Sequence, residues 1–330
     1  MLLIGRLLSK TSPSLLTLNR PFLTPASFLS YGAMADVKLR LVQFETASSP
    51  QRVGVQLGDG GSVVDVCAAE PSLPRDMRSF LQGWDTNLPL AAKVAEAVSS
   101  SSDHIFAAAS CTLKAPIYDP QKLLCVGMNY VDHCKEQNYP VPQEPIIFSK
   151  FASAITEPNG AVIHPKETDS LDYEVELAFV ISRRGKHIKE SEAMSHVAGY
   201  TVAHDVSARD WQMKKNGKQW LLGKTFDTFC PLGPAIVTPS SLSDPHKLGI
   251  RCRLNGELVQ NSNTEQLVHK TGALVAFISR FMTLEPGDVV LTGTPPGVGC
   301  FRDPPIWLKK GDVVECEIDE IGKITNTIIQ

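Results

Sequence analysis

Long apolar runs are absent from this 330-residue chain. Nowhere do the roughly 18 consecutive apolar residues occur that a membrane-spanning helix requires, so we expect no transmembrane segment and no membrane partner. Runs of basic residues interleaved with aromatic ones are also missing, and the formal net charge is −3. We therefore do not expect nucleic acid as a partner.

Paired cysteine motifs are missing as well. The eight cysteines form no CxxC pair and no zinc-ligand spacing, and several lie in apolar runs, as Cys125 does in LLCVG. We expect them to be reduced thiols in the core of a protein from a reducing compartment.

Acidic residues are absent from the first 34 positions. This segment contains Arg6, Lys10, Arg20 and many hydroxyl side chains, and the first acidic residue is Asp36. Such a composition is typical of a mitochondrial transit peptide. A secretory signal is disfavoured because no long apolar core precedes a small-residue cleavage site, and a disordered tail is the remaining alternative. We predict that residues 1–34 are a transit peptide and that the protein is mitochondrial, in the matrix.

The rest of the chain divides into two predicted domains, a small N-terminal α+β domain over residues 35–118 and a catalytic domain over 119–330. In the first domain, alternating and helical apolar patterns around a glycine-rich turn indicate a few short elements. These are strands at 37–45 and 62–68 and helices at 76–84 and 88–98.

The second domain is rich in short segments of β-favouring residues, so we predict a mostly β (α+β) fold with a few covering helices. Asn255-Gly256 between alternating flanks predicts a two-residue hairpin. One clear helix is predicted at 271–281, with the Thr271 hydroxyl as its cap. Further strands are predicted at 173–182, 198–207, 233–238, 249–260, 287–293 and 311–319.

Two carboxylates in DYEVE (172–176) form the first candidate site. On a strand, Glu174 and Glu176 project to the same face, where they repel each other unless a cation joins them. Asp205, at the end of the next apolar segment, is a candidate third ligand. An all-oxygen site suits Mg²⁺, Mn²⁺ or Ca²⁺ rather than zinc. A solvated strand face is the alternative for E-x-E alone.

Three further segments carry candidate groups. His133 and Glu136, at i and i+3 on a predicted helix, suit a general base oriented by a carboxylate, although an exposed pair is the alternative. The loop at 137–145 that follows is able to act as a lid. Arg209 matches a carboxylate geometrically or, alternatively, pairs with Asp205 at a helix cap.

The chain resembles the fumarylacetoacetate hydrolase superfamily over about residues 120–330, and most of all its mitochondrial domain-containing members of type 2. The resemblance rests on six segments in one order: LLCVGMNYVDHCKE, FSKF, DYEVELAFVI, HDVSARDWQ, GKTFDTFCPLGP and LTGTPPGVG. It implies a mixed β-roll catalytic domain, a homodimer, and Mg²⁺ or Mn²⁺ held by Glu174, Glu176 and Asp205.

The same resemblance implies roles for other residues. It implies that a lid brings the His133–Glu136 dyad to the site, and that Lys224 stabilises negative charge on the substrate. One departure is His204, where relatives often have asparagine before the metal-binding aspartate. It also implies that positions of the family's substrate pocket fall on Arg209, Gln212, Thr294 and Lys150.

For members of this branch, the resemblance implies oxaloacetate enol–keto tautomerase activity, with a small 2-oxo acid as the substrate. The alternatives are an acylpyruvate hydrolase or an oxaloacetate decarboxylase that uses the same residues. A non-catalytic metal- or ligand-binding protein is the alternative from another functional class.

Overall fold

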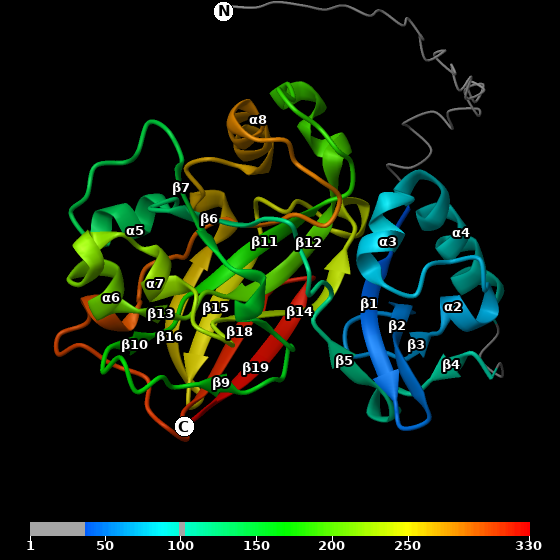
Figure 1. Cartoon of the computed structure of the whole chain (residues 1–330), viewed down its shortest axis with the longest axis horizontal. Helices are drawn as coiled ribbons and strands as arrows, with labels where there is room; N and C mark the ends of the chain where they lie inside the picture. The colour runs from blue at the N-terminus through cyan, green and yellow to red at the C-terminus, as the bar shows by residue number, and fades with distance from the viewer. Residues whose placement is uncertain (1–36, 99–102) are drawn as a thin grey trace, which may run out of the picture.

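A computed structural model describes residues 37–98 and 103–330 (Figure 1). The predicted transit peptide, residues 1–34, lies outside the described residues. No helix in the described part of the chain is both long enough and apolar enough to cross a bilayer.

A large mixed sheet of 12 strands forms the centre of the molecule. Its main path runs β4-β3-β2-β1-β14-β12-β11-β17-β6-β7, with β5 beside β1 and β8 beside β14. Most neighbours are antiparallel, but β17–β6 and β14–β8 are parallel, so the predicted mostly β, mixed character is confirmed. The strands are β1 Arg40–Thr46, β2 Ser49–Gln56, β3 Val63–Val64, β4 Ile105–Phe106, β5 Thr112–Lys114, β6 Leu123–Gly127, β7 Ile146–Lys150, β8 Ile155–Thr156, β11 Val175–Ile181, β12 Val197–His204, β14 Cys230–Val237 and β17 Val289–Leu291.

The N-terminal segment extends this sheet, because β1 pairs antiparallel with β14. Helices α2, α3 and α4 lie beside its strands (Figure 1). The strand predicted at 62–68 is wrong after Val64, since Asp65 caps α2 by accepting a hydrogen bond from the backbone N–H of Ala68. What remains of this strand, β3, pairs with β2 and β4, and the sequence pattern revealed neither of these two strands. The helices are α2 Val66–Ala69, α3 Met77–Gln82 and α4 Trp84–Ala97.

A second sheet, in the order β16-β15-β18-β19-β9, packs against β11, β12 and β14 of the first. The predicted hairpin is confirmed: β15 and β16 are joined at Asn255 and Gly256, whose φ angles are 53° and 85°. Positive φ at both positions is what a tight hairpin turn requires. The strands are β9 Val162–Ile163, β15 Gly249–Leu254, β16 Glu257–Asn263, β18 Val313–Ile318 and β19 Gly322–Ile329.

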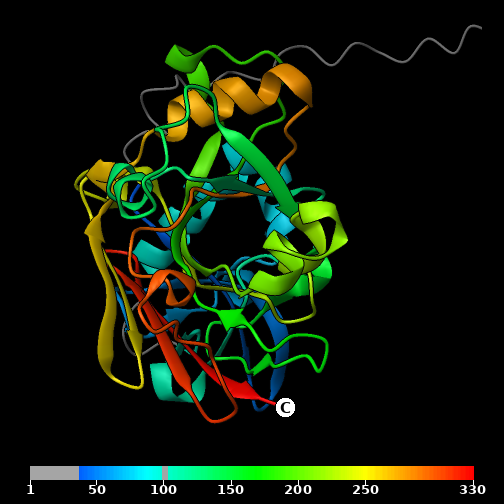
Figure 2. The same ribbon diagram turned by 90° about the vertical axis from the view of Figure 1, so that its left-hand side faces the viewer.

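The remaining helices cover the sheets and carry part of the site. Figure 2 views the molecule from the side of α5, α6 and α7, with α8 above them. Helix α8 has the predicted bounds, but the predicted cap is wrong: Lys270 is the capping residue, and the Thr271 hydroxyl instead contacts Tyr200 and His246. These elements are α5 Val131–Glu136, α6 Arg209–Met213, α7 Leu221–Lys224, α8 Thr271–Phe281 and the small pair β10 Leu171–Asp172 and β13 Ser207–Ala208.

Candidate active site

Adjacent antiparallel strands bring three carboxylates together. Glu174 directly precedes β11 and Glu176 is its second residue, so both project to one face, as their spacing predicts. Asp205 follows β12, and its backbone N–H donates to the carbonyl of Glu174 at 2.9 Å. One carboxylate oxygen from each of the three lies within 4.8 Å of the others. Among the described residues, this is the one such group able to share an ion.

Three buried basic side chains surround these carboxylates. Lys224 Nζ donates to Glu174 Oε2 at 2.7 Å and to Asp205 Oδ2 at 2.8 Å. Lys150 Nζ lies 2.6 Å from Asp205 Oδ1. Arg209 donates to Glu174 Oε1 at 2.6 Å through Nη2. The carboxylates that the sequence predicted to repel each other are therefore largely neutralised by the protein itself.

This arrangement shifts the pKa values of the two glutamates in opposite directions. Burial acts to raise the pKa of Glu174, but Arg209 and Lys224 outweigh it and lower that pKa to about 2. Burial also raises the pKa of Glu176, and here the neighbouring Asp205 and Glu174 carboxylates add to the effect, so the pKa is well above its ordinary value. Glu174 is thus an anion and Glu176 retains a proton more readily than an ordinary glutamate.

Glu176 marks the point at which the charge balance is incomplete. Its Oε2 accepts a hydrogen bond from the Gly293 N–H at 2.6 Å, but within the described residues no basic side chain reaches ion-pairing distance. A divalent cation would complete the balance, and hard carboxylate oxygens are the donors that such ions prefer. The residues present therefore fit a metal ion.

The predicted dyad is formed on α5. His133 Nδ1 and Glu136 Oε2 are 2.9 Å apart, and Glu136 Oε1 accepts a hydrogen bond from the Gly297 N–H at 2.8 Å. On the other side of the ring, the Gln137 side-chain amide lies 2.6 Å from His133 Nε2. The sequence motifs gave no signal for Gln137, because a glutamine at a helix end is usually solvated.

Two of the three carboxylates, the imidazole of the dyad and most of the substrate-pocket candidates line one cavity of about 90 Å³. Lys150 does not line it: its ammonium is fully buried behind Asp205 and also donates to three backbone carbonyls. The polar lining residues include His133, Gln137, Glu174, Glu176, Arg209, Gln212, Lys224 and Thr294. Apolar walls come from Met128, Phe148, Met213, Trp220 and Phe301, among others.

Supporting residues fix this cavity from behind. Asp172 accepts from Arg209 Nε at 2.8 Å and from the Gly299 N–H at 2.7 Å, a role that the DYEVE pattern did not reveal. Gln260 of β16 donates to the Thr294 hydroxyl at 2.9 Å and accepts from the Val175 N–H at 3.0 Å. The Asp172–Gly299 and Gln260–Val175 contacts each join segments more than 80 residues apart in sequence, so no local pattern encodes them.

His204, the noted departure from relatives, is fully buried, and its Nδ1 lies 3.2 Å from Asn326 Oδ1 on β19. Burial lowers the pKa of His204 to about 4, so the ring is neutral near pH 7. It therefore adds no positive charge beside Asp205.

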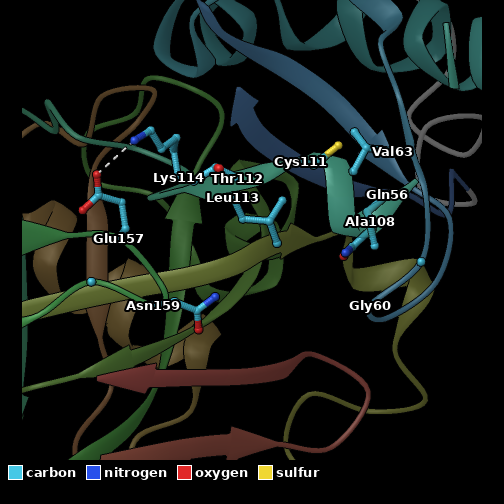
Figure 3. Close-up of a pocket in the computed structure, with 12 residues that line it drawn as sticks. Gln56, Gly60, Val63, Ala108, Cys111, Thr112, Leu113, Lys114, Glu157 and Asn159 are labelled. Carbon is cyan, nitrogen blue, oxygen red and sulfur yellow. Dashed lines mark hydrogen bonds and ion pairs between the residues drawn. The ribbon is translucent and has the colours of Figure 1, made fainter. Parts of the chain in front are cut away.

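A larger cavity of about 480 Å³ lies elsewhere, between β5 and the turn that connects β8 with β9 (Figure 3). Lys114 and Glu157 face each other there at 3.3 Å. This lysine also pairs with Glu45, so its charge is already neutralised. Glu157 is the one carboxylate among the residues that line this cavity, and no member of the three-carboxylate group is among them.

Comparisons with known proteins identify relatives of this chain. The sequence profile of the family described as "Fumarylacetoacetate (FAA) hydrolase C-terminal" matches residues 122–329. A Xenopus laevis protein named "Oxaloacetate tautomerase fahd2, mitochondrial" is 61% identical over 89% of this chain and 91% of its own. The human "Oxaloacetate tautomerase FAHD2A, mitochondrial" is 56% identical over 88% and 92%. The solved fumarylacetoacetate hydrolase of Exiguobacterium antarcticum superposes with a TM-score of 0.75 at 34% identity, over 88% of this chain and 99% of that one.

Proposed function

The chain belongs to the fumarylacetoacetate hydrolase family, and from this membership we propose that it is a metal-dependent oxaloacetate enol–keto tautomerase of the mitochondrial matrix. The observation that carries the proposal is one cavity lined by Glu174, Glu176, Arg209 and His133, and Glu136 lies 2.9 Å from the ring of that histidine. The names of relatives that match nearly the whole chain support both the reaction and the compartment. A transit peptide at residues 1–34 is the corresponding proposal for the N-terminus.

For the metal site, we propose Glu174, Glu176 and Asp205 as the ligands and Mg²⁺ as the ion, with Mn²⁺ or Ca²⁺ as alternatives. The donor set of three carboxylates supports a hard cation. When bound, such an ion polarises the C2 oxygen of a 2-oxo acid and offsets the negative charge that develops there. Lys150, which contacts Asp205 and not the cavity, would orient this ligand rather than bind the substrate.

For proton transfer, we propose that His133 removes and returns the C3 proton of the substrate, and that Glu136 orients the His133 ring. The carboxylate of Glu136 is fixed by the Gly297 N–H and accepts from Nδ1, which leaves Nε2 to exchange a proton. Lys224 adds a fixed positive charge beside the carboxylates. Arg209, Gln212 and Thr294 line the cavity and would contact the substrate's carboxylates and oxygen atoms.

Substrate chemistry favours isomerisation over bond cleavage. The C4 group of oxaloacetate is a carboxylate, a poor electrophile, so attack by water at that carbon is disfavoured. Decarboxylation requires this carboxylate to leave as neutral CO₂, which a dry pocket favours. An ion pair between the carboxylate and a cation such as Arg209 would oppose this loss of charge. The retained option is therefore movement of a proton between C3 and the enol oxygen.

The test follows enol-oxaloacetate absorbance and CO₂ release in the same sample of mature protein with Mg²⁺. We expect rapid loss of the enol without CO₂. Pyruvate and CO₂ appearing as fast as the enol disappears would indicate a decarboxylase instead. Faster turnover of acylpyruvates than of oxaloacetate would indicate a hydrolase, and unchanged activity in chelator would remove the metal from the proposal.

We further propose a homodimer and the division into domains at about residue 118. For a dimer, two exposed apolar residues offer support: Ile163 of β9 and Ile329 of β19 are paired neighbours, exposed by 43% and 40%. Sedimentation equilibrium of the mature protein would give the mass of the assembly.

A further inference from the structure

One contact beside the His–Glu pair is unexplained by the function proposed above. The Gln137 amide nitrogen lies 2.6 Å from Nε2 of His133, the nitrogen that has to exchange the substrate's proton. Gln137 is also the C-terminal cap of α5, where its backbone N–H donates to the carbonyl of His133 at 3.2 Å. Both side chains line the same cavity as Glu174 and Glu176.

The donors and acceptors of this group can be assigned. A carboxylate only accepts hydrogen bonds, so the 2.9 Å contact with Glu136 places the ring proton on Nδ1 of His133. A neutral imidazole with its proton on Nδ1 has its lone pair on Nε2. The Gln137 side chain must then donate to that lone pair through its NH₂ group. His133 thus carries the tautomer of a proton acceptor, but its accepting position is occupied.

We propose that Gln137 is a positioning residue that holds His133 in the Nδ1–H form and occupies Nε2 until the substrate displaces it. The inference rests on the proposed function, since it takes His133 as the group that moves the C3 proton. In the keto-to-enol direction the C3–H bond breaks and the Nε2–H bond forms. The C–H electron pair becomes the C2–C3 double bond, and the C2 oxygen gains the negative charge and then takes a proton from solvent, while Nε2 releases its proton to solvent and regains its lone pair. The enol-to-keto direction reverses each step.

The position of Gln137 in the chain allows the substrate to displace its side chain from Nε2. It is the last residue anchored to α5 and the first of the segment 137–145, which forms neither helix nor strand before β7 begins at Ile146. The side chain is only partly buried, whereas His133 is 5% exposed. A side chain at the start of a loop can therefore rotate away while the imidazole keeps its place.

Two substitutions of similar volume separate this role from simple packing. In Gln137→Glu the new carboxylate can only accept, so it draws a proton onto Nε2 and leaves His133 as an imidazolium between two carboxylates. This ring has no lone pair for the substrate, and we expect kcat to fall by about two to four orders of magnitude. In Gln137→Leu Nε2 is open but loses the donor that holds it, so we expect kcat to fall by roughly threefold to tenfold, much less than in Gln137→Glu, with KM unchanged or lower. The matched control is Gln143→Glu, the same change at an exposed position in the same loop.

Ring-nitrogen NMR of the full-length mature protein supplies a readout independent of turnover, with the His133 signals assigned by their loss in His133→Gln. We expect one protonated nitrogen in wild type and Gln137→Leu, and two in Gln137→Glu. Wild-type kcat in Gln137→Glu, or equal losses in the Glu and Leu variants with equal thermal midpoints, would overturn the proposal. If wild type shows no tautomerase activity, the proposed function fails, while the NMR comparison still decides the role of Gln137.

Discussion

Replacing Asp205 by Asn should destabilise the protein in chelator, whereas replacing Glu176 by Gln should not. The two carboxyl groups are both buried and belong to the same cluster, yet their partners differ. Asp205 contacts the ammonium groups of Lys150 and Lys224 at 2.6 and 2.8 Å, and the side chains of all three are at most 2% exposed. Glu176 accepts from a backbone N–H and has a raised pKa, so neutral glutamine mimics its protonated form.

The expected magnitude follows from these contacts. Removal of one partner from a buried ion pair leaves an uncompensated charge and typically costs about 3–5 kcal/mol. In Asp205→Asn the neutral amide would face two uncompensated ammonium groups, although its oxygen could still accept a hydrogen bond from one of them. An unfolding entropy of about 2.1 cal/mol/K per residue corresponds, for roughly 300 residues, to about 1.6 °C per kcal/mol, so we expect the thermal midpoint to fall by about 5–8 °C. For Glu176→Gln we expect a change of less than about 1 kcal/mol, the range of substitutions that remove no ion pair.

The assay is thermal unfolding of wild type and both variants in EDTA, together with calorimetric titration of Mg²⁺. Both variants should lose metal binding and activity, but only Asp205→Asn should lose stability. A raised midpoint in Asp205→Asn would mean that repulsion among the carboxylates dominates, as the sequence alone suggested. Equal losses in the two variants would show that the lysine contacts do not distinguish them, and would refute the reasoning.

Four other outcomes are expected. Glu136→Gln should lower the tautomerase rate by about two to four orders of magnitude, with substrate binding little changed, and a rate within a few-fold of wild type would contradict the dyad. Because the folded-state pKa of Glu176 is raised above 4.5, Mg²⁺ must displace a proton, so metal affinity should rise with pH through the window above 4.5. In chelator, the raised pKa of Glu176 contributes stability to the fold at low pH, and this stability is lost as the pH rises through the raised value. Calorimetry of Mg²⁺ binding in buffers of different ionisation enthalpy would measure the proton released on binding, and release of no proton would contradict the expected pH dependence of affinity. A reporter fused to residues 1–40 should enter mitochondria, and a cytosolic reporter would count against the transit peptide.

Local patterns predicted those parts of the fold and site that depend on residues close in sequence. Asn255-Gly256 specified its hairpin because both positions require positive φ, and the E-x-E spacing placed two carboxylates on one face of β11. The i, i+3 spacing of His133 and Glu136 likewise predicted their contact.

Long-range partners were not predictable in the same way. Lys150 ends β7, yet its ammonium group pairs with Asp205, which follows β12. This ion pair is determined by the order of the strands in the sheet and not by the FSKF motif. Thr271 looked like a helix cap but its hydroxyl is engaged by Tyr200, because tertiary contacts compete with local capping. Strand β19 was not predicted, although its buried and exposed residues alternate regularly. This strand supplies Asn326, which contacts His204 behind the site.

The basic side chains around the carboxylates also determine when the protein can acquire its ion. Small metallodomains such as zinc fingers stay unfolded until metal arrives, because nothing else offsets the charge of their ligands. Here Lys150, Arg209 and Lys224 provide that offset from within the chain. Folding therefore does not depend on the proposed ion, and its occupancy would follow its free concentration around the finished protein. A compartment that varies the free concentration of that cation would adjust the active fraction of this enzyme without unfolding any of it.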